Sequence, residues 1–540
     1  MSMQFGILLD RPQLKRWQLN CLQRLLGLPQ VQPVCLIQVG GPTTKLSRGP
    51  APSEIPADDG TLEAVLPLPA ALEALSGAIP SGLDFVLSFA SAPAAAALRE
   101  QARWGVWRYQ FGDWTRLRGG PPGFWEVHYG DPESAVLLVR ETPDPDAVVV
   151  LREGYVRTLA QSVARNRAQL LSVAVHFAAQ MCLDLQNGVV EHMSTATRRS
   201  GAPAHGDPTS LQRAICTLRI LGRMAAEGYH ALFTHTQWNV GIVEQPITAF
   251  VNGARPTSVR WLPAPKRNEF RADPFGVLRD GHLTILLEDF SYISNRGTIS
   301  ATQPAAGTTV PVTIGPQPAV HLSYPYLIEV EGRLYCMPEA HEAREVVLYE
   351  VKRFPDDWAR VARFPIETVI VDATLFRHED RWWIAGSEPG TKGASSELHL
   401  WYAPAIEGPW TAHPGNPVKI DIRSARPAGT PFYRDGQLYR PAQDCSRSYG
   451  GRVSINHVLA LTPTAFQEVV VATVEPAATG LFREGIHTLS SVGAITLIDG
   501  KRTLFVPEEF QRNARHFLRQ ALRRLGVSSK PAAGVPPVAS

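Results

Sequence analysis

The sequence is poor in cysteine, and its cysteines are not arranged to bind a metal. No CxxC or similar ligand spacing connects them. The 540 residues contain six, at Cys21, Cys35, Cys182, Cys216, Cys336 and Cys445. We therefore expect no metal centre, and free thiols in a reducing compartment.

An excess of charge and long apolar runs are also missing. The 53 basic and 50 acidic residues give a formal net charge of only +3, so bulk charge implies no nucleic-acid partner. No stretch reaches the roughly 18 uninterrupted apolar residues of a membrane-spanning helix. The opening residues 1–10 are too short an apolar stretch for a signal peptide. We expect a cytoplasmic protein without an integral membrane segment.

The chain is longer than one hydrophobic core supports, so we expect at least two domains. Residues 5–9, 14–26 and 31–39 have the patterns of a strand, a helix and a strand. Another strand pattern at 83–89 and a helix pattern at 92–101 continue the alternation. This pattern is typical of an α/β domain with a parallel, Rossmann-like sheet.

Four parts are predicted along the chain. The α/β domain covers residues 1–160, and helical patterns form a connector over 161–230. Short strands separated by turns fill 231–507. Residues 508–540 form a basic helix and a disordered tail rich in proline and alanine. The predicted fold class is therefore α/β plus all-β.

An internal repeat decides the architecture of the all-β part. Five times an apolar strand meets a tight acidic turn and a second apolar strand. The turns are Asp280-Gly281, Glu331-Gly332, Glu379-Asp380, Asp435-Gly436 and Asp499-Gly500. Successive turns lie about 48 to 64 residues apart, which suits the four-stranded blades of a propeller. We predict a five-bladed β-propeller closed by residues 233–243; a β-sandwich is the alternative.

Acidic residues recur in register with these turns. Asp273 precedes the first turn by the same offset at which Asp372 precedes the third, near the start of innermost strands. Glu339 lies on a following strand. Since inner strands start beside the propeller axis, Asp273, Glu339 and Asp372 are candidate catalytic residues for glycosyl hydrolysis or transfer, which needs two carboxyl groups. Caps at strand ends are the alternative reading.

Sugar-binding side chains are expected around these acids. Guanidinium and amide groups suit sugar hydroxyls, and flat aromatic rings suit the apolar faces of sugars. The candidates are Arg426, Arg440, Gln443, Asp444, His487, Tyr324 and Trp382. Trp382 and Trp383 are adjacent in a strand, so only one of them can face a shared pocket.

The propeller part resembles a known family. The segments are Phe270 to Gly276, Ser323 to Tyr326, Met337 to Glu339, Val371 to Thr374 and Arg440 to Asp444. They resemble the N-terminal domain of glucosamine inositolphosphorylceramide transferases. More distantly, this part looks like arabinanase- and invertase-type hydrolases. That resemblance implies Asp273 as base or nucleophile, Glu339 as acid and Asp372 as modulator of the acid's pKa.

The first domain resembles the formyltransferase domain of methionyl-tRNA and sugar formyltransferases. The resemblance rests on Gly105-Val-Trp107, on the stretch 118–126 and on the stretch 143–146. In that family an Asn and a His polarise the formyl donor and shuttle a proton. Here Trp107 and Tyr109 occupy those positions, and Asp144 matches the family's Asp. Neither an indole nor a phenol replaces a neutral imidazole near pH 7, so formyl transfer from formyl-folate is not expected.

Three functional readings follow. The leading one is a carbohydrate-active propeller that binds, and hydrolyses or transfers, glycosyl units in polysaccharide or glycolipid metabolism. Its ligand would be a glycan or a sugar-containing small molecule. The second reading is a formyltransferase that uses formyl-folate as cofactor and acts on an amino-sugar. The third is a non-catalytic glycan-binding scaffold of a biosynthetic complex, docked through the basic helix.

Overall fold

The chain folds into two compact units, Met1–Leu221 and Gly222–Ser540. The computed structural model describes residues 2–11, 13–39, 43–45, 62–67, 75–76, 80–189, 197–316, 320–366, 368–389, 395–515 and 518. The predicted tail at 528–540 lies outside these residues. Of the predicted basic helix, residues 510–515 are helical.

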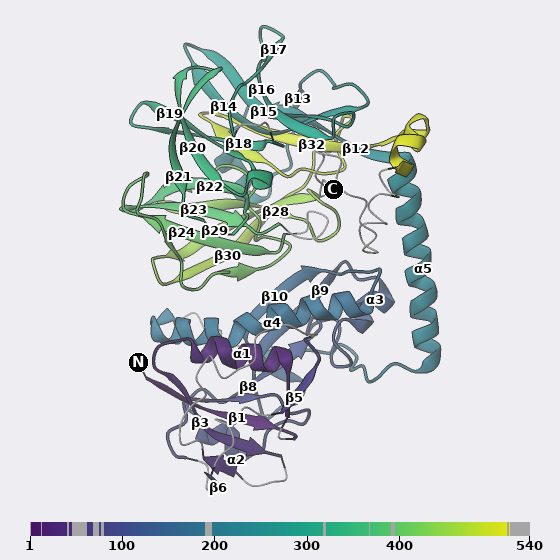
Figure 1. Cartoon of the computed structure of the whole chain (residues 1–540), viewed down its shortest axis with the longest axis vertical. Coiled ribbons are helices and arrows are strands. Elements are labelled where there is room, and N and C mark those ends of the chain that lie inside the picture. The colour runs from purple at the N-terminus through teal and green to yellow at the C-terminus, as the bar shows by residue number, and fades with distance from the viewer. Residues whose placement is uncertain are drawn as a thin grey trace. The chain divides into compact units, whose positions relative to one another are not determined.

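The first unit is built on a nine-stranded mixed sheet (Figure 1). In spatial order its strands are β11 (Arg198–Arg199), β10 (Ala147–Arg157), β9 (Glu133–Glu141), β8 (Val106–Phe111), β7 (Phe85–Ser88), β1 (Met3–Leu9), β3 (Val31–Gln38), β4 (Thr43–Lys45) and β6 (Leu75–Ser76). Four central strands pair in parallel, in the order β8, β7, β1 and β3. The strands outside this group pair antiparallel, as β9 does with β8. The predicted strand–helix–strand opening and its parallel pairing are confirmed. β2 (Gln13–Lys15) and β5 (Val65–Pro67) form a separate pair.

Helices cover the sheet of the first unit. They are α1 (Arg16–Leu26), α2 (Ala96–Gln101), α3 (Phe124–Tyr129) and α4 (Val163–Gln186). α4 packs along α1, β9 and β10. It is long and apolar enough to cross a membrane, but 67% of its most apolar window is buried, as in the core helix of an α/β layer.

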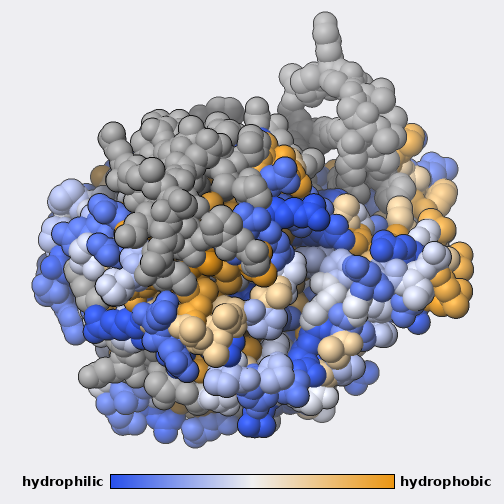
Figure 2. All heavy atoms as spheres, turned by 90° about the horizontal axis from the view of Figure 1, so that it is seen from below, coloured by the Kyte–Doolittle hydropathy of each residue, from blue (hydrophilic) through white to orange (hydrophobic). Residues whose placement is uncertain are grey.

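The predicted connector over 161–230 is not a separate body. α4 belongs to the core of the first unit, and α5 (Ser210–Phe233) runs across the boundary between the units. Cys216 on α5 is buried with Leu117 and Phe124. Leu211 and Leu218, in contrast, are 69% and 68% exposed. Figure 2 shows hydrophobic residues at the right-hand edge of the face that it draws.

The second unit is a five-bladed propeller, as predicted. Blade 1 contains β14 (Glu269–Arg279), β15 (His282–Ser291), β16 (Arg296–Gln303) and β17 (Thr308–Pro311). Blade 2 contains β18 (Ser323–Val330), β19 (Arg333–Glu339), β20 (Val346–Arg353) and β21 (Asp357–Phe364). Blade 3 contains β22 (Val371–His378), β23 (Arg381–Ser387), β24 (Glu397–Ala403), β25 (Thr411–Ala412) and a short fifth strand, β26 (Lys419–Ile420). Blade 4 contains β27 (Phe432–Arg434), β28 (Gln437–Asp444), β29 (Arg452–Leu461) and β30 (Phe466–Val474).

Blade 5 closes the ring with strands from both ends of this unit. Its order is β31 (Leu489–Val492), β32 (Ile495–Phe505), β12 (Thr234–Val243) and β13 (Arg260–Trp261). β12 pairs with β32 along its whole length, from Thr234 opposite Phe505 to Val243 opposite Thr496. This confirms the predicted closing strand, which removes two open sheet edges. Short 3-10 turns, η4 (Ile247–Asn252), η5 (His341–Ala343) and η7 (Pro507–Glu509), complete the unit.

Four of the five predicted acidic turns are hairpin turns between the first two strands of a blade. Asp280, Glu331, Glu379 and Asp435 have left-handed φ values of 50–52°, as the tight I′ and II′ hairpin turns require of their first central residue. The fifth prediction is wrong, because Asp499 lies in the middle of β32. The hairpin of blade 5 turns instead at residues 493–494, between Val492 and Ile495. An acidic residue before a glycine is a turn signal only where the strand pattern stops on both sides.

Candidate functional site at the propeller axis

The three predicted catalytic acids come together at the axis. Asp273 lies on β14, Glu339 at the end of β19 and Asp372 on β22, so three blades contribute one carboxyl each. Their side chains are nearly enclosed, with residue exposures of 6%, 9% and 3%. The three acids therefore share one buried region at the axis, and their catalytic role stays a prediction.

A repeated backbone feature positions these side chains. The inner strands of blades 1, 2 and 3 each contain a bulge, centred on Asp273, Tyr324 and Asp372. These residues have φ values of 52°, 41° and 52°. Left-handed backbone is unfavourable for residues other than glycine and persists only where the surroundings enforce it. The bulge turns each of these side chains out of the regular alternation of its strand.

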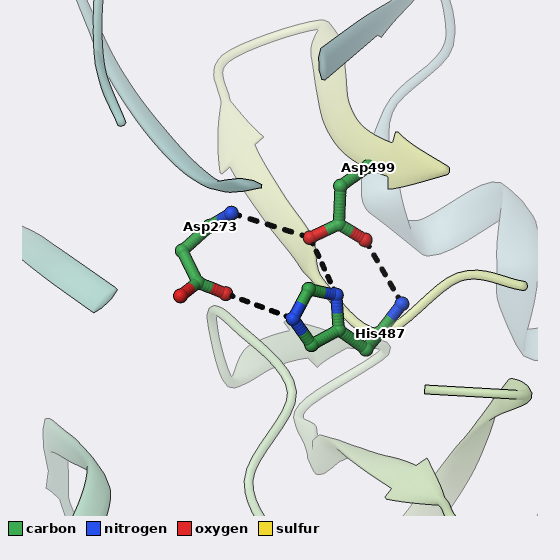
Figure 3. A group of neighbouring side chains, drawn as sticks. All are labelled: Asp273, His487 and Asp499. Atoms are coloured by element: carbon green, nitrogen blue, oxygen red, sulfur yellow. Dashed lines mark hydrogen bonds and ion pairs between the residues drawn. The ribbon is translucent and has the colours of Figure 1, made fainter. Parts of the chain in front are cut away.

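Asp273 is held by groups from two other blades. One carboxylate oxygen accepts a hydrogen bond from the backbone N–H of Tyr324 at 3.2 Å, and the other from the Thr488 hydroxyl at 3.0 Å. His487 Nε2 lies 3.3 Å from that second oxygen (Figure 3). Asp273 thus joins blades 1, 2 and 5, and it remains within reach of an imidazole.

His487 is placed between two carboxylates. Its Nδ1 lies 2.7 Å from Asp499, which also accepts hydrogen bonds from the backbone N–H groups of His487, Thr488 and Asp273 at 2.9, 3.1 and 3.3 Å. Figure 3 shows the imidazole lying between Asp273 and Asp499. Asp499 therefore orients the imidazole whose other nitrogen faces Asp273.

The second half of the cluster couples Glu339 to Asp372. Glu339 accepts a hydrogen bond from the backbone N–H of Asp372 at 2.9 Å and pairs with His341 at 2.8 Å. Asp372 is paired with Arg426 and accepts a hydrogen bond from Gln443 at 2.8 Å. Two of the predicted sugar-binding residues, Arg426 and Gln443, thus contact a predicted catalytic carboxyl directly.

The surroundings drive the pKa values of these acids apart. Burial raises the pKa of Asp273 to about 7; the charge of His487 opposes this, while Asp499 and Asp372 add to it. Burial also raises the pKa of Asp372, against the effect of Arg426. For Glu339 burial acts in the same direction, but the hydrogen bond and charge of His341 outweigh it and the pKa is lowered. A proton donor and an ionised carboxylate therefore coexist near neutral pH.

A fourth buried acid, Glu288, was not predicted. Burial raises its pKa well above the usual range, and Asp273 and Glu339 add to the effect. His321 lies 3.5 Å from it. The register contained a signal, since Glu288 follows Gly281 by the same interval as Glu339 follows Gly332. Asp499 was also missed, because it was assigned to a turn.

The other predicted residues lie in different surroundings. Tyr324 braces the axis: its hydroxyl bonds Thr374 at 2.9 Å and accepts the Gly429 N–H at 2.8 Å. Arg440 faces away from Asp372 and is paired with Glu468 at 2.5 Å. Trp382 and Trp383 lie in two different apolar clusters, in agreement with the alternation of a strand. Arg440 and Trp382 are therefore not carried into the proposed site.

The described residues include one buried group with the spacing of metal ligands. Donor atoms of Asp273, His487 and Asp499 lie within 4.8 Å of one another. The two carboxylates already accept several hydrogen bonds, and the imidazole is paired on both sides. The arrangement is a triad in which the imidazole of His487 lies within ion-pair distance of both carboxylates.

The predicted formyltransferase positions are packed into the core of the first unit. Trp107 is fully buried and stacks on Phe85 with ring centroids 3.9 Å apart. Tyr109, 8% exposed, contacts Trp17 edge to face. Asp144 lies in the turn between β9 and β10 and pairs with Arg199 at 2.8 Å. Both aromatic rings therefore act as core residues.

The propeller is similar in sequence to transferases from plants. The family model for the N-terminal part of glucosamine inositolphosphorylceramide transferase 1 matches residues 256–480. The transferase of that name from Arabidopsis thaliana is 32% identical over 254 residues, covering 44% of this chain and 32% of the relative. The one from Oryza sativa subsp. japonica is 30% identical over 250 residues, covering 44% and 34%. The chain thus spans about a third of the length of these relatives.

Two matches among solved structures are glycoside hydrolases of low sequence identity and low TM-score. One is a member of the GH130 family of mannoside phosphorylases, 11% identical with a TM-score of 0.32, covering 46% of this chain and 93% of that chain. Another is a family 117 glycoside hydrolase of Zobellia galactanivorans, 12% identical with a TM-score of 0.31, covering 50% and 91%.

Proposed function

We propose that the propeller is a carbohydrate-active module that binds a glycosyl unit at its axis and breaks or transfers the glycosidic bond. The observation that carries this proposal is the convergence of Asp273, Glu339 and Asp372 with pKa values shifted in opposite directions. Glycosyl transfer requires that division between a proton donor and an ionised carboxylate. The similarity to the transferase family supports a sugar or a glycolipid head group as ligand.

The electrostatics favour a division of roles that differs from the one the resemblance implied. Asp273, with its pKa raised to about 7, is proposed as the group that gives its proton to the leaving oxygen as the C–O bond breaks. Glu339, which His341 keeps ionised, is proposed as the base or nucleophile on the opposite side. Arg426 holds Asp372 and thereby fixes the position of Glu339, which bonds the Asp372 backbone.

Asp273→Asn tests the catalytic part of this proposal. The substitution removes the acidic proton but keeps the shape, so turnover on a glycan that the protein cleaves or transfers should fall by about 10³-fold or more. Binding of that glycan should persist. Asp280→Asn, in the exposed turn of the same hairpin, is the matched control and should retain full activity.

The outcomes separate enzyme from scaffold. Full activity in Asp273→Asn contradicts the catalytic assignment. Glycan binding without turnover in the wild-type protein identifies a glycan-binding scaffold instead. A variant that loses binding and unfolds at a lower temperature assigns Asp273 to the bracing of blades 1, 2 and 5.

For the first unit we propose a formyltransferase-like fold that does not transfer formyl groups. Its parallel β1–α1–β3 crossover supports the fold. The packing of Trp107 against Phe85, and of Tyr109 against Trp17, supports the loss of the chemistry. Incubation of the full chain with formyl-folate and amino-sugars should yield no formylated product.

A further inference from the structure

A polar cavity of about 360 Å³ lies between blades 4 and 5 of the second unit. Its walls come from the β28–β29 connection, the segment after β30, and loops of blade 5. Seven of its thirteen lining residues are charged: Arg255, Arg447, Arg452, Arg483, Asp444, Glu475 and Glu484. Arginines outnumber carboxylates, so the cavity favours a negatively charged ligand.

The carboxylates of the lining already have partners. Asp444 is 2.6 Å from Arg452, whose other terminal nitrogen lies 3.3 Å from Glu475. Glu484 accepts a hydrogen bond from the Thr503 hydroxyl at 2.7 Å. One arginine, Arg452, therefore bridges two of the three carboxylates of the lining.

Two arginines of the lining differ from Arg452 in their exposure and in their partners. Arg255 and Arg483 are exposed, and within the part of the chain that the structure describes neither has a carboxylate partner. A guanidinium presents a planar fork of donors that matches the oxygens of a phosphate or a carboxylate. These two side chains are thus available to a ligand.

The cavity adjoins the axial cluster through one strand end and one loop. Gln443 and Asp444 are neighbours at the end of β28 and point to opposite sides of the strand. Gln443 bonds Asp372 at the axis, whereas Asp444 lines the cavity. In the loop that follows, Ser448 lines the cavity, and the ring of Tyr449 lies 5.2 Å from the Arg426 guanidinium carbon.

We propose that this cavity is a subsite for the anionic group of a sugar. That group is a phosphate or a carboxylate, and Arg255 and Arg483 bind it. The neighbouring hydroxyl groups of Ser446 and Ser448 suit the polar remainder of such a ligand. The sugar part of this inference rests on the function proposed for the axis. The oxyanion part rests on the cavity alone.

Titration calorimetry on the full chain tests the subsite with four probes: glucose 6-phosphate, glucuronate, glucose and inorganic phosphate. At least one of the two anionic sugars should bind tenfold or more tightly than glucose and inorganic phosphate. The tighter of the two identifies phosphate or carboxylate as the preferred group. Arg255→Ala/Arg483→Ala should weaken that binding at least tenfold.

The control is Arg353→Ala/Arg434→Ala, which removes two surface arginines of the same unit that lie outside the cavity. It should change the affinity less than twofold. The inference is overturned by an unchanged affinity in the cavity variant, by an equal loss in the control, or by failure of both anionic sugars to bind. Inorganic phosphate that binds as tightly as glucose 6-phosphate overturns the sugar part.

Asp273→Asn separates this inference from the proposed catalysis. That variant should bind the preferred anionic sugar with wild-type affinity. If it loses this binding while unfolding at the wild-type temperature, the anion is held at the axis and the cavity assignment fails. If the variant still binds the anionic sugar and also still turns over the glycan, the catalytic proposal fails while the subsite stands.

Discussion

The propeller axis and the β8 face of the first unit hold their buried side chains in opposite ways. At the axis, Asp273, Asp372 and His487 are 6%, 3% and 2% exposed, although all three are ionisable. On β8, Trp107 and Tyr109 fill an equally buried position with aromatic rings. The axis therefore buries carboxyl and imidazole groups, whereas the β8 face buries aromatic rings.

This difference has an energetic meaning. Burying an ionisable group is unfavourable unless partners compensate for its lost hydration, whereas aromatic packing is favourable by itself. The axis supplies such partners across blades, for example Arg426 for Asp372 and Asp499 for His487. A fold that needed only stability would gain more from packing of the β8 kind, which makes the axial acids candidates for function.

Introducing an Asn and a His on β8 should have the largest effect. Trp107→Asn with Tyr109→His empties an aromatic core and buries polar groups there, so we expect a destabilisation of roughly 4–7 kcal/mol. No formyl transfer should appear. Urea unfolding and assays with formyl-folate check both parts. Formyl transfer by a folded double variant would contradict the view that this face is only a core.

Removing the cation from the axis should have the next largest effect. Arg426→Met leaves the buried carboxylate of Asp372 without its charge partner, at a cost of about 3–5 kcal/mol. Adding Asp372→Asn should recover much of this loss, which chemical unfolding of the single and double variants measures. The control is Arg434→Met, whose exposed pair with Asp435 should contribute under about 1 kcal/mol. Equal losses in both single variants would show that the axial pair is not special.

A smaller effect is expected in how the free energy of unfolding depends on pH, which should differ between the propeller axis and the β8 face. Because the folded-state pKa of Asp273 is raised to about 7, the folded chain binds more protons than the unfolded chain between about pH 4 and 7. The free energy of unfolding should therefore fall as pH rises through that window. His487, whose pKa is raised by Asp499 and Asp273 although burial lowers it, acts in the same direction.

Asp273→Asn should flatten this slope, whereas Trp107→Phe should leave it unchanged because no proton is involved. Urea unfolding of the wild type and both variants at pH 5 and 7.5 measures the difference. A stability that rises between these pH values would contradict the raised pKa.

The smallest effect concerns backbone conformation inside the propeller. Glu331 in an exposed hairpin turn and Tyr324 at the axis share left-handed φ values of 51° and 41°. Asn tolerates this conformation better than most residues, so Glu331→Asn should stabilise by about 0.5 kcal/mol. Tyr324→Asn should instead destabilise the fold by about 3–5 kcal/mol, because it removes a fully buried ring and the hydrogen bonds to Thr374 and Gly429. Thermal unfolding of both variants compares them.

Local patterns were enough to predict the propeller. A tight turn needs particular residues at fixed positions, and a strand hairpin between two turns has a limited length, so the repeat appears in the order of the residues. The same register predicted Asp273 and Asp372 at the axis. It failed at Asp499-Gly500, where a turn-like pair sits inside β32, since nothing local showed that the strand continued.

What the sequence by itself determined is therefore the repeat, the closing strand and the axial position of Asp273 and Asp372, which the register aligned. Only the tertiary structure decided which side chains meet. It brought Glu288, His487 and Asp499 to the same buried region as the acids, and it turned Arg440 toward Glu468. Contacts between blades depend on ring closure and on bulges that reorient single side chains, and pKa values depend on burial and on neighbours distant in the chain. Neither is encoded in a local pattern.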